Sequence, residues 1–304
     1  MLIGHKLRFA GVVVAGVFSA GALHGAAFAD GEPEQAALQG YVMPDTQVWN
    51  LPGGDGQIYR IFVSIPEAAP PQHGFPVLYV LDGNAMFAGF AESRRLQEIK
   101  DPDIGRSIVV GIGYPAGKPY DLARRLYDFT PPFPEQVPAS ERDLAKMRTG
   151  GEQAFMAFLL DRLRPEIARR YAVDPDRQAL FGHSLGGLFA LHMLYTRPGA
   201  FRAIIAASPT QWWNDQQILQ EERTFSQRLR DRAITGPVAR LMLVAGDREA
   251  VKLNVWDAEA LARRLQPLSA YGLRVRFEAF KDEDHLSVPA RAVTPTLRFA
   301  FAFP

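Results

Sequence analysis

The sequence ALFGHSLGGLFA at residues 179–190 decides the fold, because it contains the pattern Gly-x-Ser-x-Gly around Ser184. The apolar segment 179–181 precedes the pattern, and the apolar segment Leu188–Tyr195 follows it. A strand, a tight turn and a helix in this order form a nucleophile elbow, in which a strained turn exposes the serine hydroxyl. We therefore interpret Ser184 as a catalytic nucleophile. The alternative is an ordinary glycine-rich turn between a strand and a helix.

Three glycines around the serine are expected to make this turn possible. Gly182 and Gly186 flank Ser184, where a Cβ atom would clash in a strained turn. Gly187 is expected to let the following helix pack closely against the sheet. The pattern therefore predicts that the elbow needs small residues at all three positions.

The segments on both sides of the elbow predict an α/β fold with a mostly parallel, doubly wound sheet. Short β-rich apolar segments alternate with amphipathic helical stretches along the chain. The segments 77–81 and 241–244 show no polar alternation, which is typical of strands buried on both faces. The expected strands are Ile58–Ile65, Pro76–Leu81, Ser107–Ile112, Ala179–Gly182, Ala203–Ala207, Leu241–Ala245 and Val275–Phe280, after a weak first strand near Thr46–Leu51.

Helical spacing of apolar residues predicts the helices Glu152–Tyr171, Trp256–Leu265 and Ser287–Phe301, the first with a kink at Pro165. The stretch 113–151 fits neither period and contains six prolines. We interpret it as a long functional loop or cap inserted over the site.

A serine hydroxyl needs a base, and elimination among the histidines points to His285. His183 lies inside the motif, His192 lies two turns into the next helix, and His73 lies in a proline-rich loop. His285 follows the last expected strand, where the base of such a fold belongs. The alternative for His285 is a surface histidine among acidic neighbours.

The acid is expected after the strand 241–245, in the sequence Gly-Asp-Arg-Glu at 246–249. Both carboxylates are possible, and Glu249 is favoured over Asp247 because proteins with such an elbow commonly have the acid three residues after this glycine. The other carboxylate would then cap backbone N–H groups of a turn. A Ser–His dyad without a working acid is the remaining alternative.

The oxyanion hole needs two N–H donors aimed at one point. The backbone of Leu185, next to the nucleophile, supplies one of them. The loop after the strand 76–81 reads Asp-Gly-Asn, so either Gly83 or Asn84 supplies the other. A plain tight turn is the alternative for this loop.

The first 29 residues are expected to be a secretory signal peptide, so the single α/β domain would cover residues 30–304. Lys6 and Arg8 give a basic start, residues 9–23 are apolar, and Ala-Phe-Ala at 27–29 resembles a cleavage site. The alternative is an uncleaved membrane anchor. We expect export to the periplasm, with no membrane span once the signal is removed.

Composition excludes several classes of function. The signal segment holds two of the 34 basic residues and none of the 33 acidic ones, so the remaining chain has a net charge of −1. Such a chain has no general attraction for nucleic acid. It also has no cysteine, which excludes disulfides, thiol catalysis and cysteine-based metal sites.

Several motifs give the chain a resemblance to the putative-esterase (esterase D-like) family of α/β-hydrolases, and within it to periplasmic enterobactin esterases. These motifs are PVLYVLDGN at 76–84, RLYDFTP at 125–131, TGG at 149–151, LFGHSLGGLFA at 180–190, SPTQWW at 208–213 and Asp-His at 284–285. Where such relatives have Gly-Glu-x-Glu, this chain has Gly-Asp-Arg-Glu, which keeps Glu249 in place. The resemblance implies hydrolysis of a trilactone of 2,3-dihydroxybenzoyl-serine, and it implies no cofactor and no resident metal.

The ferric form of such a substrate is anionic and aromatic, and this chemistry suggests substrate-binding residues. Arg124, Arg125 and Arg148 flank the inserted stretch and could pair with catecholate oxygens or stack on rings. Trp212 and Trp213 follow a strand at the ligand-binding edge of the sheet. Structural ion pairs are the alternative for the arginines, and core packing is the alternative for the tryptophans.

The expected partner is a catecholate siderophore, iron-loaded, with contact to siderophore uptake machinery. Two other functions stay open from the sequence. One is a general carboxylesterase or thioesterase that uses the same triad. The other is a siderophore-binding protein without turnover.

Overall fold

The computed structural model describes residues 41–54, 56–135, 137, 141–249 and 258–302. The chain divides into two units, residues 1–42 and 43–304, and the fold below belongs to the second. The predicted signal peptide lies outside the described residues. Among the residues that are described, none of the helices has the length and apolar character needed to cross a bilayer.

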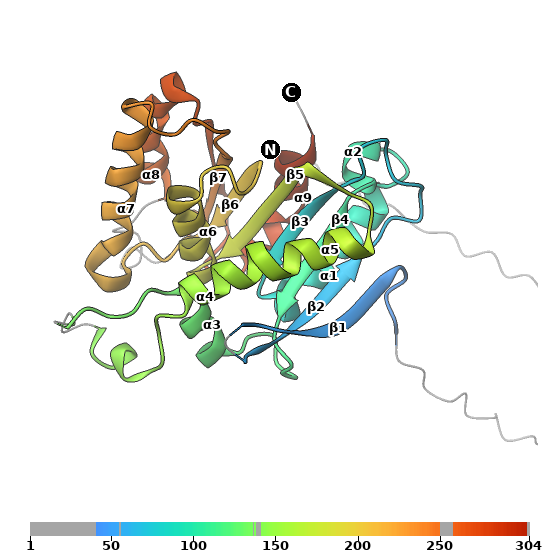
Figure 1. Cartoon of the computed structure of the whole chain (residues 1–304), viewed down its shortest axis with the longest axis horizontal. Coiled ribbons are helices and arrows are strands. Elements are labelled where there is room, and N and C mark those ends of the chain that lie inside the picture. Colours follow the sequence, from blue (N-terminus) through green and yellow to red (C-terminus); the bar gives the residue numbers. More distant parts are fainter. Residues whose placement is uncertain (1–40, 55, 136, 138–140, 250–257, 303–304) are drawn as a thin grey trace, which may run out of the picture. The chain divides into compact units, whose positions relative to one another are not determined.

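An eight-stranded sheet in the order β1-β2-β4-β3-β5-β6-β7-β8 forms the centre of this unit (Figure 1). β1 pairs antiparallel with β2 and β2 with β4, whereas every other neighbouring pair is parallel. The predicted mostly parallel α/β sheet is therefore confirmed. The strands are β1 Thr46–Pro52, β2 Ile58–Ser64, β3 Phe75–Leu81, β4 Ile108–Gly113, β5 Val173–His183, β6 Ala203–Ala207, β7 Arg240–Gly246 and β8 Val275–Phe280.

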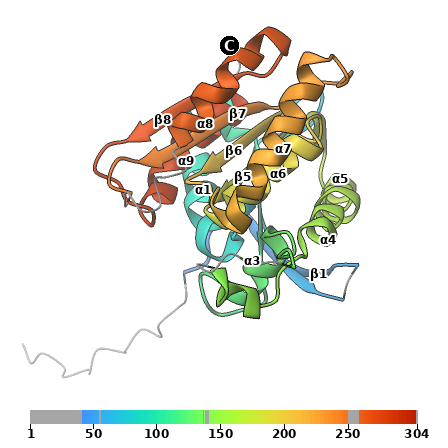
Figure 2. The ribbon, with the colours of Figure 1, turned by 90° about the vertical axis from the view of Figure 1, so that its left-hand side faces the viewer.

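Helices cover both faces of the sheet, and the two-residue period of the strands divides the core between them. On β3, Val77 and Tyr79 pack into one apolar cluster while Leu78 and Val80 pack into the other. Helices α1 and α9 lie against the second cluster, and α6 and α7 lie against the first (Figure 2). The α-helices are α1 Gly83–Gln97, α2 Pro102–Gly105, α3 Leu122–Phe129, α4 Glu152–Ala157, α5 Arg164–Arg170, α6 Leu185–Thr196, α7 Trp213–Arg230, α8 Ala258–Leu265 and α9 Val288–Phe301.

The predicted helix at 152–171 is present, with an irregularity near Pro165. A π-helical turn at Phe158–Leu163 joins α4 to α5, and Pro165 lies in the first turn of α5. Proline has no N–H to donate and its ring crowds the carbonyl four residues earlier, so the backbone widens just before it. Residues 250–257, where the start of another predicted helix falls, lie outside the described residues.

The inserted stretch 113–151 differs from the long loop that its prolines suggested, because it contains α3. Leu126 and Phe129 of α3 are buried, and Asp121 caps the helix by accepting a hydrogen bond from the backbone N–H of Arg124 at 3.1 Å. The helices α1 and α7 were not predicted either. Both begin directly at motifs that the sequence presented as turns or ligand-binding loops, at Gly83 and Trp213.

Candidate active site

Ser184 lies in a strained turn between β5 and α6, with φ 59° and ψ −118°. A Cβ atom on Gly182 would lie 2.0 Å from the carbonyl oxygen of Gly186, so only glycine fits at 182. A Cβ atom on Gly187 would lie 3.0 Å from the carbonyl oxygen of Ala207, which agrees with the expected close packing. The expectation for Gly186 was wrong, because a Cβ atom there would make only ordinary contacts at 3.5 Å.

The structure brings Ser184, His285 and Glu249 together from the carboxyl ends of three strands. His285 Nε2 lies 3.0 Å from Ser184 Oγ, and His285 Nδ1 lies 3.3 Å from Glu249 Oε2. These contacts are in the order that a Ser–His–acid triad needs: the acid fixes the imidazole tautomer and Nε2 takes the serine proton.

Glu249, and not Asp247, is the carboxylate that contacts His285. Glu249 Oε1 accepts hydrogen bonds from Ser208 Oγ at 2.5 Å and from the Gly246 N–H at 2.7 Å. Burial raises the pKa of Glu249, but its hydrogen bonds with His285, Ser208 and Gly246 outweigh burial and lower it. Asp247 Oδ1 instead accepts the backbone N–H of Asp282 at 2.7 Å, which is the turn-capping role expected for the unused carboxylate.

The two expected oxyanion donors begin neighbouring helices at the same edge of the sheet. Leu185 is the first residue of α6 and Gly83 is the first residue of α1, and the strands before them, β5 and β3, are adjacent and parallel. Backbone N–H groups in the first turn of a helix have no intrahelical partner. The Asn84 side chain is occupied, since its Nδ2 donates to the carbonyl oxygens of Tyr114 and Ala116, so only the backbone N–H of Asn84 competes with that of Gly83. The assignment of Leu185 and Gly83 as oxyanion donors stays a prediction.

A pocket of about 460 Å³ opens beside Ser184. Trp212 and Phe277 give it aromatic walls, and the carboxylates of Asp247, Glu249 and Glu259 line it together with His285. Its described lining contains no lysine or arginine. The other lining residues are Ser208, Pro209, Thr210, Ala245, Gly246, Ala258 and Ala279.

A family model described as "Putative esterase" matches residues 56–285, which is most of the chain. The chain belongs to this esterase family. The ferri-bacillibactin esterase BesA of Bacillus subtilis is 36% identical over 267 residues, covering 86% of this chain and 91% of that protein. The siderophore enterobactin esterase of Emericella nidulans is 32% identical over 278 residues, covering 83% of this chain and 92% of that protein.

A solved structure, the BES protein from Bacillus cereus, superimposes on this esterase with a TM-score of 0.81 at 32% identity. The match covers 88% of this chain and all of that one. The chain is therefore a carboxylic ester hydrolase with the α/β-hydrolase fold, as the sequence motifs predicted.

Arg125 was expected to bind substrate, but in this esterase it is buried in an ion pair. Its guanidinium is buried and makes two parallel hydrogen bonds to Asp82, each 3.0 Å long. Burial alone would lower the pKa of Arg125, but the charge and hydrogen bonds of Asp82 raise it. Arg125 also donates to the carbonyl oxygen of His183 at 3.4 Å. It thus ties the loop before Gly83 to the elbow, and it is not available to a ligand.

The other two arginines do not reach the pocket either. Arg124 lies over the rings of Tyr59 and Tyr114, at 5.1 and 4.9 Å from their centroids. Arg148 lies 3.9 Å from the ring centroid of Tyr127. Aromatic stacking within the protein explains these positions, and a sequence pattern does not distinguish it from stacking on a ligand.

The two tryptophans lie in different environments. Trp212 lines the pocket, as expected, whereas Trp213 is only 1% exposed and packs against Phe133 with ring centroids 4.7 Å apart. The alternative of core packing therefore holds for Trp213. Successive residues at the start of a helix face different directions, which separates these two neighbours.

Two hydroxyl residues at the site, Ser208 and Thr210, were not predicted from the sequence. Ser208 Oγ donates a hydrogen bond to Glu249, and Thr210 Oγ1 lies 3.2 Å from Ser184 Oγ. Their motif, SPTQWW, was conspicuous only for its tryptophans. Their position could have indicated a role at the site, because they directly follow β6, the strand next to β5 and its elbow.

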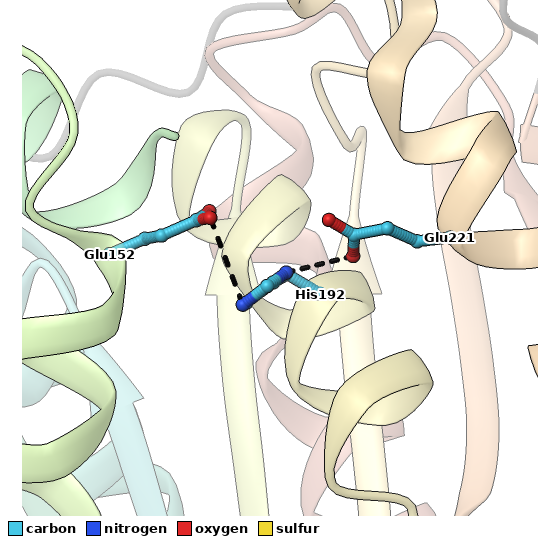
Figure 3. A group of neighbouring side chains, drawn as sticks. All are labelled: Glu152, His192 and Glu221. Carbon is cyan, nitrogen blue, oxygen red and sulfur yellow. Dashed lines mark hydrogen bonds and ion pairs between the residues drawn. The ribbon is translucent and has the colours of Figure 1, made fainter. Parts of the chain in front are cut away.

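Glu152, His192 and Glu221, none of which lines the pocket beside Ser184, form a second cluster, and Figure 3 shows their side chains. Glu221 contacts His192 Nδ1 at 2.8 Å, and Glu152 lies 3.9 Å from His192 Nε2, on the other side of the ring. A metal ion needs its ligand atoms to converge at about 2.0–2.2 Å from one point. The two carboxylates contact different nitrogens of the His192 imidazole, so they do not converge on one point with it. The cluster instead joins α4, α6 and α7 through this buried imidazole. Burial lowers the pKa of His192, but its contacts with the two carboxylates raise it.

Proposed function

We propose that this esterase hydrolyses the ester bonds of a trilactone catecholate siderophore, of the enterobactin and bacillibactin type, and thereby releases iron. The observation that carries the proposal is the assembled Ser184–His285–Glu249 contact set in a chain whose relatives over more than four fifths of its length are named as siderophore esterases. The aromatic walls at Trp212 and Phe277 support it, because they offer flat surfaces to a catechol ring.

In the proposed reaction, Ser184 is the nucleophile and His285 acts first as general base and then as general acid. His285 Nε2 removes the Ser184 proton while Oγ attacks the ester carbonyl, and the resulting oxyanion faces the N–H groups of Leu185 and Gly83. His285 then gives the proton to the departing serine-derived alkoxide of the substrate. A water molecule repeats the sequence on the acyl-enzyme, and the acid product leaves.

One experiment tests the proposal. Purified protein is incubated with iron-free and ferric enterobactin, with iron-free and ferric bacillibactin, and with p-nitrophenyl acetate, and products are followed by mass spectrometry. We expect linear trimer, dimer or monomer products from at least one siderophore at a higher kcat/KM than for the small ester. A higher kcat/KM for p-nitrophenyl acetate than for every siderophore would contradict the proposal.

A general carboxylesterase is the second candidate, and a specific observation favours it. None of the three arginines expected to select an anionic ligand lines the pocket, whose described lining holds the carboxylates of Asp247, Glu249 and Glu259 but no lysine or arginine. A trianionic ferric complex would gain no local attraction from these side chains. The same substrate comparison separates the two candidates, and a preference for uncharged aryl or acyl esters would favour the second.

We also propose that the protein is exported to the periplasm. The support is the basic start, the apolar stretch 9–23 and the Ala-Phe-Ala sequence at 27–29. Cell fractionation with N-terminal sequencing of the exported protein tests it, and a cytoplasmic protein that keeps Met1 would contradict it.

A further inference from the structure

Thr210 is a second hydroxyl residue in direct contact with the reacting serine. Its Oγ1 lies 3.2 Å from Ser184 Oγ, and its backbone N–H donates to the carbonyl oxygen of Ser184 at 3.1 Å. Thr210 is 6% exposed and lines the pocket. The backbone bond fixes the position of Thr210 relative to the elbow, so its hydroxyl is held beside the nucleophile before any substrate arrives.

The hydrogen on the Ser184 hydroxyl determines which of the two hydroxyl groups donates this hydrogen bond. The Ser184 hydroxyl has one hydrogen, and in the reactive state that hydrogen points to His285 Nε2, 3.0 Å away. The contact between the two hydroxyls must then run from Thr210 to Ser184. Thr210 therefore occupies one of the two lone pairs of Ser184 Oγ and leaves the other to attack the carbonyl carbon.

We propose that Thr210 is a further catalytic residue of this esterase, which donates a hydrogen bond to Ser184 Oγ and stabilises that oxygen as a leaving group. When the acyl-enzyme breaks down, the bond between the acyl carbon and Oγ breaks and its electron pair goes to Oγ, which takes a proton from His285. Negative charge develops on Oγ before that proton arrives, and the Thr210 hydroxyl is already in place to share it.

The benefit falls mainly on deacylation. An ester oxygen is a poor hydrogen-bond acceptor, so the bond from Thr210 is weak in the acyl-enzyme and strong in the transition state that expels Ser184. Before acylation the bond already exists to a neutral hydroxyl, so the gain on going to the transition state is smaller. Loss of one such hydrogen bond corresponds to a change of about three- to tenfold in rate.

The test compares Thr210→Val, which removes the hydroxyl at nearly constant shape, with Thr210→Ser, which keeps it. Stopped-flow measurements with p-nitrophenyl acetate separate the acylation burst from the deacylation rate. We expect deacylation in Thr210→Val to fall about three- to tenfold, with acylation affected less and the melting temperature unchanged. Thr210→Ser should restore most of the deacylation rate.

Two results would overturn the proposal. One is a Thr210→Val protein with the deacylation rate of the wild type. The other is an equal loss in both variants, because that would make the threonine methyl group, and not the hydroxyl, the important part. The inference rests on Ser184 as the nucleophile and not on the siderophore substrate. A small ester is therefore the probe, and failure of the siderophore assay would leave this test intact.

Discussion

The replacement Glu249→Gln should stop catalysis almost completely, because it changes which nitrogen of His285 carries the proton. Glu249 Oε1 accepts from both Ser208 Oγ and the Gly246 N–H, at 2.5 and 2.7 Å. In the glutamine variant the amide oxygen must keep that position, since an NH₂ group there would face two donors. The amide NH₂ then takes the place of Oε2, opposite His285 Nδ1.

That NH₂ group donates a hydrogen bond, so His285 Nδ1 must become the acceptor and the proton must move to Nε2. A protonated Nε2 gives up its role as base toward Ser184, although the side chains stay where they are. The corresponding acid-to-amide change in a known serine protease lowers kcat about 10⁴-fold, and we expect about 10³–10⁴ here. This corresponds to about 4–5.5 kcal/mol of transition-state stabilisation.

The assay is kcat/KM for p-nitrophenyl acetate at pH 8, with Asp247→Asn as the matched control. Asp247 accepts one backbone N–H, from Asp282, and an asparagine oxygen accepts it equally well. The control should therefore stay within about threefold of wild type, since only one exposed hydrogen bond is altered. Small and equal losses in both variants would mean that His285 works without a carboxylate, as in a Ser–His dyad. A large loss only in Asp247→Asn would make Asp247 the acid.

Three further predictions concern His183, Arg125 and the two tryptophans. Burial, reinforced by the neighbouring His285 and Arg125, lowers the pKa of His183 from 6.5 to about 3. His183 is therefore protonated in the unfolded chain below pH 6.5 but not in the folded one, and it should lower the unfolding free energy by about 2 kcal/mol between pH 7 and pH 5. Urea unfolding of His183→Asn should lack this part of the pH dependence, and an identical pH dependence would count against it. Arg125→Ala should cost about 3–5 kcal/mol of stability and slow hydrolysis of every ester alike, because it leaves Asp82 buried without its partner. A loss confined to siderophore substrates at unchanged stability would restore its substrate-binding role. Trp212→Ala should raise KM for the trilactone with little change in melting temperature, whereas Trp213→Ala should cost about 3–5 kcal/mol of stability, and the reverse pattern would exchange their roles.

The sheet and the meeting of Ser184 with His285 could be predicted because each has a strong local signal. Ser184 lies in a motif whose strand and helix are both visible in the sequence, and His285 remained after the other histidines were assigned. The buried strands β3 and β7 have continuous apolar sequences, as strands covered on both faces require.

The substrate-binding residues could not be predicted in the same way, since their roles depend on partners far away in the sequence. Arg125 pairs with Asp82, which lies 43 residues earlier, and nothing near Arg125 identifies that partner. Arg124 and Arg125 are adjacent, yet one stacks on tyrosine rings and the other is enclosed in an ion pair. Composition predicts that arginines are available, but only the packing determines whether a ligand reaches them.

Thr210 illustrates the same limit at the site itself. Its hydroxyl contacts Ser184 because β5 and β6 are adjacent parallel strands, so the loops that follow them meet at one edge of the sheet. The sequence predicted both strands and hence this meeting point. It did not show which side chain of the motif at 208–213 would be turned toward the nucleophile.

The most direct test of the central claim is the turnover of Ser184→Ala on p-nitrophenyl acetate, measured beside the wild type, with circular dichroism to establish that both are folded. Triad residues act as a unit, so we expect a loss of about 10⁴–10⁶-fold in kcat with an unchanged spectrum. A folded Ser184→Ala protein that hydrolyses the ester at a rate near that of the wild type would contradict it.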